Sequence, residues 1–325
     1  MTAIEHDQDL NPYMQGNFRP VREEVTEFEL EVLGEIPTEL SGRYLRNGPN
    51  PFAEVPSNHH WFLGAGMVHG IRLLEGEAKW YRNRYVKTPL LDDPDKQRIS
   101  ETGTIDYTVS AANTHVIRQG GRILALEEGA FPYELTPELE TVGAHDFEGK
   151  LDKAMTAHPK ICPETGELIF YSYGQLPPYL LYHRVDAQGK LVQTEEITVG
   201  GPTMMHDFQI TRNHSIFMDL PVVFNLELAL QGTMPFLWDD DYPARIGIMP
   251  RAGKNEDVKW FEVEPCYVFH TLNAWEEGNE VIFDVCRISE VWRGTSDMAS
   301  GDGVQTLHRF TFDMVSGNVK EETLD

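Results

Sequence analysis

Hydrophobic residues recur along the chain in short, nearly continuous runs, and no long segment keeps the 3.6-residue period of an amphipathic helix. Each run follows a turn signal of Gly, Asn, Asp or Pro, which is typical of β-strands buried on both faces. The sequence therefore predicts an all-β protein, with a few helical turns in "SAANTH" or "FNLELALQG". The clearest strand candidates are "GGRILALEEG", "TGELIFYSYG", "NHSIFMDLPVVF" and "GNEVIFDVCRI".

A histidine lies upstream of each of these four runs at a similar distance. The pairs are His115 and Ile123, His158 and Leu168, His206 and Ile216, and His270 and Val281, separated by 8, 10, 10 and 11 residues. We interpret each unit as a strand ending at a histidine, a connection and a return strand, which suits the blades of a β-propeller. Because equivalent strand ends of successive blades converge on one axis, the spacing nominates all four histidines as metal ligands.

A second repeat also favours blades over a β-sandwich. The segments "LLYHRVDAQGKLVQTEEITV" and "TLHRFTFDMVSGNVKEETL" share an apolar–His–Arg–apolar start, an Asp, a turn containing Gly and an acidic strand. We expect His183 and His308, which lie in these segments, to be strand residues without a ligand role. Strand-like units continue on both sides of the proline-rich linkers, so residues 1–325 are predicted to form a single domain.

Composition limits the classes of partner. The chain has 325 residues, of which 41% are hydrophobic, so it can bury a substantial core. A formal charge of −25, without a basic block, argues against nucleic acid and anionic membranes as partners. The N-terminus lacks the pattern of a signal peptide, which predicts a cytoplasmic protein. Three cysteines without C-x-x-C spacing are expected to be buried small hydrophobic residues.

Converging imidazoles form a metal site made of nitrogen ligands alone, and neutral imidazole suits Fe(II), Zn, Cu or Ni. Structural zinc is disfavoured because no cysteine joins the set. Acidic residues that accept the second ring N–H would be needed to orient the rings, and Glu127 and Glu128 are candidates. A metal-dependent lactonase propeller is an alternative, but it would be expected to bind calcium through oxygen ligands.

Several longer motifs carry a specific resemblance. They are "NPYMQGNFRPV", "GEIPTELSGRYLRNGPNP", "WFLGAGMVHGIRL", "ANTHV", "ILALEEGAFPYEL", "MTAHPKICPETGEL", "MMHDFQIT" and "VFHTLNAWEEG". In these the sequence resembles the carotenoid cleavage oxygenases, which include apocarotenoid and lignostilbene dioxygenases. The resemblance implies a seven-bladed β-propeller that holds one catalytic Fe²⁺ through four histidines, three of them backed by glutamates.

Matched motif by motif, the resemblance assigns a role to individual residues. It implies that the first three iron ligands are His158, His206 and His270 and that Glu128 is the first backing acid. Within "ANTHV" it places Thr114, rather than His115, near the iron, where the methyl group would restrict an open coordination position. Phe131 and Phe269 lie in the matched motifs and are candidate substrate-pocket residues.

The activity that the resemblance implies is insertion of both atoms of O₂ across a conjugated C=C bond, giving two carbonyl products. Stilbene-cleaving members carry a lysine before the glutamate of "LALEEG". This chain has Glu127, which would repel a phenolate, so an apocarotenoid or related polyene is favoured over the lignostilbene-type alternative. A non-catalytic polyene-binding propeller and an isomerase or hydrolase that uses iron as a Lewis acid are further alternatives.

Two expectations concern partners and completeness. Peripheral membrane contact would serve substrate uptake, although the charge of −25 argues against attraction to anionic lipid. Members of the family continue beyond the point that matches "KEETLD", and the fourth histidine and two backing glutamates would lie there. We therefore interpret residues 1–325 as a C-terminally truncated propeller and expect weak or no activity from this part alone.

Overall fold

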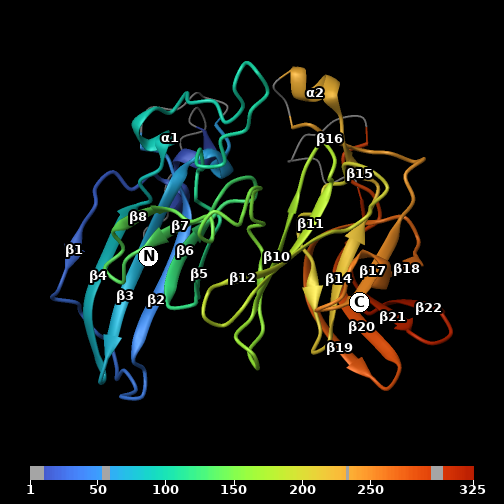
Figure 1. Cartoon of the computed structure of the whole chain (residues 1–325). Helices are drawn as coiled ribbons and strands as arrows, with labels where there is room; N and C mark the ends of the chain where they lie inside the picture. Colours follow the sequence, from blue (N-terminus) through green and yellow to red (C-terminus); the bar gives the residue numbers. More distant parts are fainter. Residues whose placement is uncertain (1–10, 53–58, 232–233, 294–302) are drawn as a thin grey trace. The chain divides into compact units, whose positions relative to one another are not determined.

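The computed structural model describes residues 11–52, 59–231, 234–293 and 303–325. The chain divides into two compact units, Met1–Ala157 and His158–Asp325. Strands dominate the described residues of both units (Figure 1), which confirms the all-β prediction. The prediction that residues 1–325 form a single domain stays a prediction.

Helices are few and short in the described ranges. The two α-helices are α1 (Pro89–Asp92) and α2 (Leu226–Leu230), and "SAANTH" forms no helix. The 3₁₀ turns are Pro12–Met14, Gly16–Phe18, Trp61–Leu63 and Asn255–Asp257. Among these described helices, none is long and apolar enough to cross a bilayer.

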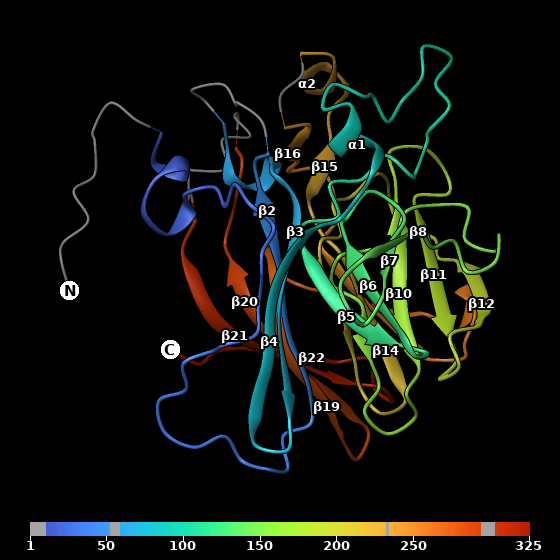
Figure 2. The ribbon, with the colours of Figure 1, turned by 90° about the vertical axis from the view of Figure 1, so that its left-hand side faces the viewer.

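The first unit contains two antiparallel four-stranded sheets (Figure 2). One has the order β1-β4-β3-β2, and the other runs in chain order from β5 to β8. Their strands are β1 (Thr26–Glu27), β2 (Gly42–Asn50), β3 (Ala65–Leu74), β4 (Glu77–Tyr85), β5 (His115–Gln119), β6 (Arg122–Leu126), β7 (Tyr133–Leu135) and β8 (Thr141–Ala144).

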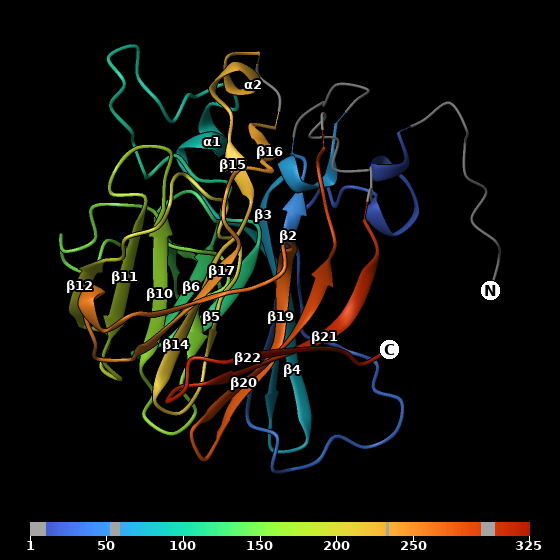
Figure 3. The same cartoon turned by 90° about the vertical axis from the view of Figure 1, so that its right-hand side faces the viewer.

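The second unit contains three antiparallel four-stranded sheets and a two-stranded hairpin (Figure 3). The first sheet is formed by β9 (Lys160–Ile161), β10 (Leu168–Tyr173), β11 (Leu180–Val185) and β12 (Leu191–Glu196). The second is formed by β13 (Gln209–Ile210), β14 (His214–Asp219), β17 (Arg245–Pro250) and β18 (Lys259–Glu262). The third is formed by β19 (Tyr267–Glu277), β20 (Glu280–Ile288), β21 (Gln305–Asp313) and β22 (Val319–Thr323), and β15 (Val222–Phe224) pairs with β16 (Phe236–Trp238).

Burial explains why the predicted runs form strands. The four runs correspond to β6, β10, β14 with β15, and β20. In β10, five consecutive residues are buried, whereas the outer strand β12 alternates between buried and exposed positions. Continuous burial of central strands and alternation at the edge are expected when sheets pack face to face.

The histidine repeat is real, but its geometry differs from the prediction. Each of the four histidines lies at or near the start of an edge strand of its sheet, and the apolar run is the second strand. His115 begins β5, His158 and His206 precede β9 and β13 by two and three residues, and His270 lies within β19. The prediction of a strand that ends at a histidine is therefore wrong, because the strand begins at or follows the histidine in three cases and contains it at His270.

His183 and His308 lie on strands, as the second repeat predicted, but these strands, β11 and β21, are paired on both sides and are not the outer strands of their sheets. His183 is fully buried, contacts hydroxyls of Ser172 and Thr194 at 3.1 and 3.0 Å, and stacks on Phe170. Burial lowers the pKa of His183 to about 4, so its ring is neutral at pH 7. It is a core residue whose polar atoms are hydrogen-bonded.

The cysteines follow their predicted role in part. Cys162 and Cys266 are buried, whereas Cys286 is exposed on β20. The expectation that all three are buried is wrong for Cys286, which lies just beyond the five consecutive buried residues of this strand.

The carboxylate of Glu276 on β19 binds the turn between β13 and β14. It accepts hydrogen bonds from the Asn213 backbone N–H at 3.0 Å and side-chain amide at 2.7 Å, and from the Thr211 hydroxyl. His214 Nδ1 lies 3.0 Å from the same carboxylate. Burial alone would raise the pKa of Glu276, but these donors outweigh it and lower the pKa to about 2. Glu276 is therefore ionised at neutral pH and joins two sheets of this unit.

Glu276→Gln is expected to lower Tm by roughly 2–4 °C at neutral pH, because the charged acceptor is lost. The pKa of the folded state lies below the usual value of 4.5, so this stabilisation is present above that pH and is lost as the pH falls toward 2. Thermal unfolding followed by circular dichroism should therefore show a difference in Tm that shrinks with acidification. Glu280→Gln, an exposed change on β20, is the control, and a difference independent of pH would contradict the assignment.

Candidate metal centre

Three histidines from the three four-stranded sheets of the second unit lie together. Ligand nitrogens of His158, His206 and His270 are all within 4.8 Å of one another. The two Nε2 atoms of His158 and His206 are 3.1 Å apart, and the His270 ring centroid lies 4.9 and 5.0 Å from the other two. Among the described residues, these three histidines are the group of three or more His, Cys, Asp or Glu side chains that lies close enough together to hold a metal ion.

The nitrogen separations fit one transition-metal ion. With metal–nitrogen bonds of about 2.1 Å, two ligands of one ion lie about 3.0 Å apart in octahedral and about 3.4 Å apart in tetrahedral geometry. The separation of 3.1 Å between His158 and His206 falls in this range. The His270 side chain is 57% exposed, so its ring can rotate to close the remaining distance.

A β-bulge presents His270. Val268 pairs with Arg287 and Thr271 pairs with Val285, so β19 advances by three residues where β20 advances by two. The extra residue falls at Phe269 and His270, and bulges of this kind redirect side chains and leave backbone groups unpaired. The backbone N–H of Thr271 donates instead to a carboxylate oxygen of Asp207, at 3.0 Å.

The backbone around His206 is fixed from two sides. The hydroxyl of Tyr267 donates to the Met204 carbonyl at 2.9 Å, and the hydroxyl of Tyr171 donates to the Met205 carbonyl. Both methionines and both tyrosines are buried. The apolar residues beside His206 are therefore core residues that hold its loop in place.

Asp207 connects the three histidine-bearing segments. Its Oδ1 accepts hydrogen bonds from Lys160 Nζ at 2.7 Å and from the Phe208 N–H at 2.8 Å. Its Oδ2 accepts from the Thr271 N–H and hydroxyl, both at 3.0 Å, and lies 4.0 Å from Nδ1 of His270. Lys160 follows His158 by two residues, Asp207 follows His206, and Thr271 follows His270.

Asp207 is only 3% exposed. Burial alone would raise the pKa of its carboxyl, but the Lys160 ammonium and the backbone donors of Thr271 and Phe208 outweigh burial, and the pKa is lowered. The side chain is therefore a buried anion beside the histidine group. It offsets part of the charge of a bound cation without occupying a ligand position.

Of the two predicted pocket phenylalanines, Phe269 lies beside the histidine group. Its ring centroid is 5.9 Å from that of His206, 4.8 Å from Tyr267 and 5.4 Å from Trp292. The ring of Phe131, in the first unit, contacts Tyr107 at 5.5 Å. Only Phe269 is brought to the histidines within the second unit, and the pocket role of both residues stays a prediction.

Glu128 and Thr114 also belong to the first unit. Glu128 is half-buried on the turn after β6, and Thr114 is exposed just before β5. The Thr114 N–H donates to the Leu126 carbonyl at 2.9 Å, and its hydroxyl donates to Asn113 Oδ1 at 3.0 Å. Their assigned places beside the metal stay predictions.

Glu127 is engaged within its own unit. Its Oε1 pairs with Arg98 at 2.5 Å, and its Oε2 accepts from the Ser110 hydroxyl at 3.0 Å and from the Ala111 N–H at 2.6 Å. Arg98 also donates to the Gly129 carbonyl at 2.9 Å. Because Arg98 balances the charge of Glu127, the argument that Glu127 repels a phenolic substrate loses its physical basis.

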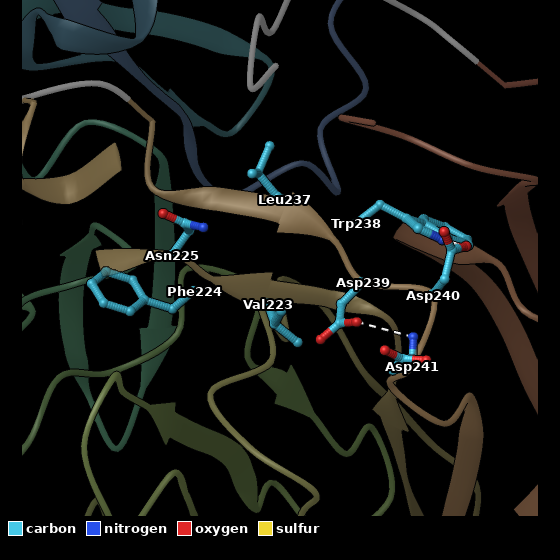
Figure 4. A pocket seen from close by; sticks show the side chains of 8 residues that line it. All are labelled: Val223, Phe224, Asn225, Leu237, Trp238, Asp239, Asp240 and Asp241. Atoms are coloured by element: carbon cyan, nitrogen blue, oxygen red, sulfur yellow. Dashed lines mark hydrogen bonds between the residues drawn. The ribbon is translucent and has the colours of Figure 1, made fainter. Parts of the chain in front are cut away.

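A pocket of about 350 Å³ lies elsewhere in the second unit, at the β15–β16 hairpin (Figure 4). No predicted site residue lines it, and two of its three carboxylates already have partners. Asp239 accepts from the Asp241 N–H at 3.0 Å, and Asp240 pairs with Arg293 at 2.7 Å. Its lining residues are Val223, Phe224, Asn225, Leu237, Trp238, Asp239, Asp240 and Asp241.

Comparison with known proteins decides the family. The family model described as retinal pigment epithelial membrane protein matches residues 18–325. A carotenoid cleavage oxygenase of Mycobacterium tuberculosis is 40% identical to this chain in an alignment 376 residues long. The alignment covers 100% of this chain and 74% of that protein. The chain belongs to the carotenoid cleavage oxygenase family. It is therefore an enzyme of the carotenoid-cleavage dioxygenase type, as the motifs predicted.

Solved structures of carotenoid cleavage oxygenases agree with the fold. The chain is similar to the lignostilbene dioxygenase of Pseudomonas brassicacearum, with a TM-score of 0.82 and 30% identity over 96% of this chain and 70% of that one. It is similar to the Synechocystis apocarotenoid oxygenase, with a TM-score of 0.79 and 26% identity over 94% of this chain and 71% of that one. The predicted β-propeller fold class is thereby confirmed.

Sequence reasoning missed Asp207, Lys160 and Thr271. A signal was present, since each lies within two residues of a histidine that the resemblance assigned to the metal. Asp207 in "MMHDF" and Lys160 in "AHPK" also carry opposite charges in segments that are otherwise uncharged, which is a second signal that they could pair.

Loss of one histidine is expected to weaken metal binding. His206→Ala should lower the metal affinity by roughly tenfold or more. It removes a direct ligand, and loss of a residue that only supports a ligand already lowers metal affinity by about tenfold. Metal content per chain after reconstitution with Fe²⁺ or Co²⁺ measures the effect. His115→Gln is the control and should retain the metal, and loss of metal in that variant would restore His115 as a ligand candidate.

Proposed function

We propose that the chain binds one Fe²⁺ through His158, His206 and His270 and cleaves a conjugated C=C bond of an apocarotenoid or related polyene. The observation that carries the proposal is the close approach of these three rings from three separate sheets. Neutral imidazoles without cysteine suit Fe(II) and leave coordination positions open. Bound Fe²⁺ would supply the electrons that activate O₂.

The supporting residues prepare the site in three ways. Asp207 offsets cationic charge from a buried position, the tyrosine hydroxyls hold the His206 loop, and the bulge presents His270. Phe269 provides an apolar ring next to His206 and packs against the buried Trp292. An apolar surface beside an exposed ligand suits an elongated hydrocarbon that must bring one double bond to the metal.

A phenolic stilbene is the second candidate substrate. The observation in its favour is the Arg98–Glu127 pair, which balances the carboxylate that would have repelled a phenolate. The lignostilbene dioxygenase of Pseudomonas brassicacearum, which the fold resembles, is named for a substrate of this kind. We rank the polyene first because the apolar ring of Phe269 lies beside His206.

Turnover under ¹⁸O₂ tests the proposal. The purified, Fe²⁺-loaded chain should bleach an apocarotenal and place ¹⁸O in both carbonyl products, trapped at once with borohydride because aldehyde oxygens exchange with water. The His206→Ala variant should leave the colour unchanged. Unlabelled products would favour the isomerase or hydrolase alternative, and tight retention of the polyene without products would favour a binding protein.

The ratio of kcat/KM for an apocarotenal and for a hydroxystilbene, measured on one preparation, decides between the substrate classes. We expect the apocarotenal to be preferred by roughly tenfold, which corresponds to about 1.4 kcal/mol of transition-state binding. A preference for the hydroxystilbene would transfer the proposal to the second candidate.

We also propose that the polyene is taken up from a neutral lipid surface. The support is α2, whose Leu226 and Leu230 are 63% and 80% exposed (Figure 1). Leu226→Ser with Leu230→Ser should reduce co-sedimentation with phosphatidylcholine vesicles by about tenfold, given the apolar area removed. Val315→Ser, a change at a residue 74% exposed, is the control. Equal loss in both variants would contradict a specific role for α2.

A further inference from the structure

We propose that Asp207 is the positioning residue of the metal centre, the side chain that fixes the three histidine-bearing segments relative to one another. The inference deepens the proposed function and rests on the same three histidines. It concerns a residue that touches neither metal nor substrate, since its contacts are to the segments that carry the ligands. The argument depends on the number, kind and origin of these contacts.

The contacts of Asp207 reach both of the other histidine segments. Lys160, at 2.7 Å, belongs to the segment of His158. Thr271, whose N–H and hydroxyl both lie at 3.0 Å, belongs to the segment of His270. The aspartate itself adjoins His206, so one carboxylate spans all three sheets of the second unit.

All the neighbours of this carboxylate are donors. Oδ1 faces Lys160 Nζ and the Phe208 N–H, and Oδ2 faces the Thr271 N–H and hydroxyl. An asparagine has the same shape, but its NH₂ group would face either the Lys160 ammonium and the Phe208 N–H or the Thr271 N–H, which are groups that only donate. Since the site is buried, this conflict is not relieved by solvent.

The contact between Asp207 and Thr271 also stabilises the backbone beside the bulge in β19. The register shift between Val268 and Thr271 places His270 outside the regular ladder of β19 and β20. Asp207 accepts the Thr271 N–H immediately after this irregular stretch. Without that acceptor, a buried polar group at the bulge would favour a different backbone path, and the His270 ring would move with it.

A second buried aspartate in the same unit provides a matched control. Asp219 is fully buried and accepts from Arg245 Nε at 2.8 Å, the Tyr242 hydroxyl at 2.5 Å and the Gly200 N–H at 3.1 Å. It therefore resembles Asp207 in burial and in having one cationic and several neutral donors. None of its partners adjoins a histidine of the metal group in the sequence.

The first test measures Co²⁺ affinity by titration of the visible absorption of the metal in the full chain. Asp207→Asn should weaken the affinity by roughly 10- to 100-fold, and Thr271→Val by roughly threefold, because it removes one of the four contacts. Lys160→Met should also weaken the affinity relative to the parent. Lys160→Arg, which keeps the cation, should retain most of the parental affinity. Asp219→Asn should leave the affinity unchanged even where it lowers Tm.

The second test needs no metal. Hydrogen exchange of backbone amides should accelerate at least tenfold at Phe208 and Thr271 in Asp207→Asn, and should stay at the parental rate there in Asp219→Asn. Parental rates at both amides in Asp207→Asn would overturn the inference. So would equal acceleration in the two variants, since that would show a general loss of stability.

The two tests separate this inference from the proposed function. If the parent binds no metal but Asp207→Asn accelerates exchange at the two amides, the proposed function fails and the positioning role of Asp207 holds. If His206→Ala loses the metal while Asp207→Asn binds it with parental affinity, the metal centre holds and the positioning role is wrong.

Discussion

The buried carboxylate of Asp207 is the interaction on which the geometry of the second unit depends most directly. It accepts hydrogen bonds from groups 47 and 64 residues away in the sequence, and each of these groups adjoins a different histidine. Burial of a charged group is costly unless its hydrogen bonds are complete, so this carboxylate is stable only when all three segments are in place. The contact therefore makes the relative position of the three sheets specific.

Other contacts extend the same constraint outward. The Glu276 carboxylate on β19 binds the turn that precedes β14, and the two tyrosine hydroxyls fix the carbonyl groups before His206. Each of these contacts joins neighbouring sheets of the unit through a polar group at a strand end. Hydrophobic packing between the sheets stabilises the unit but is not directional. These hydrogen bonds are directional and determine where the loops that carry the histidines lie.

The hydrophobic pattern was sufficient to predict the strands. The runs at β6, β10, β14 and β20 are continuous because the central strands are covered on both faces, and that condition is visible in the sequence. The histidine spacing revealed the repeat, because a repeated sheet places its edge strand at a constant distance from the next strand. It could not distinguish His115 from the other three, and that distinction came from the resemblance to the family.

The supporting contacts could not be predicted in the same way. The partners of Asp207 are remote in sequence, so the nearness of each residue to a histidine did not show that Lys160 and Thr271 contact Asp207. The bulge at Phe269 and His270 is also hidden, since "YVFHTLNAW" has the apolar character of an ordinary strand. For Glu127, the charge was visible, but the Arg98 that balances it was not.

The origin of the histidines in three successive sheets has a consequence for the order of assembly. The first and third of these sheets pair strands that are consecutive in the chain, whereas in the second sheet β14 pairs with β17 across the intervening β15–β16 hairpin. The histidine group is complete only after all three sheets have docked, with 48 residues separating even the closest pair in the sequence. A metal ion that requires all three histidines can therefore be held only after the last sheet has docked.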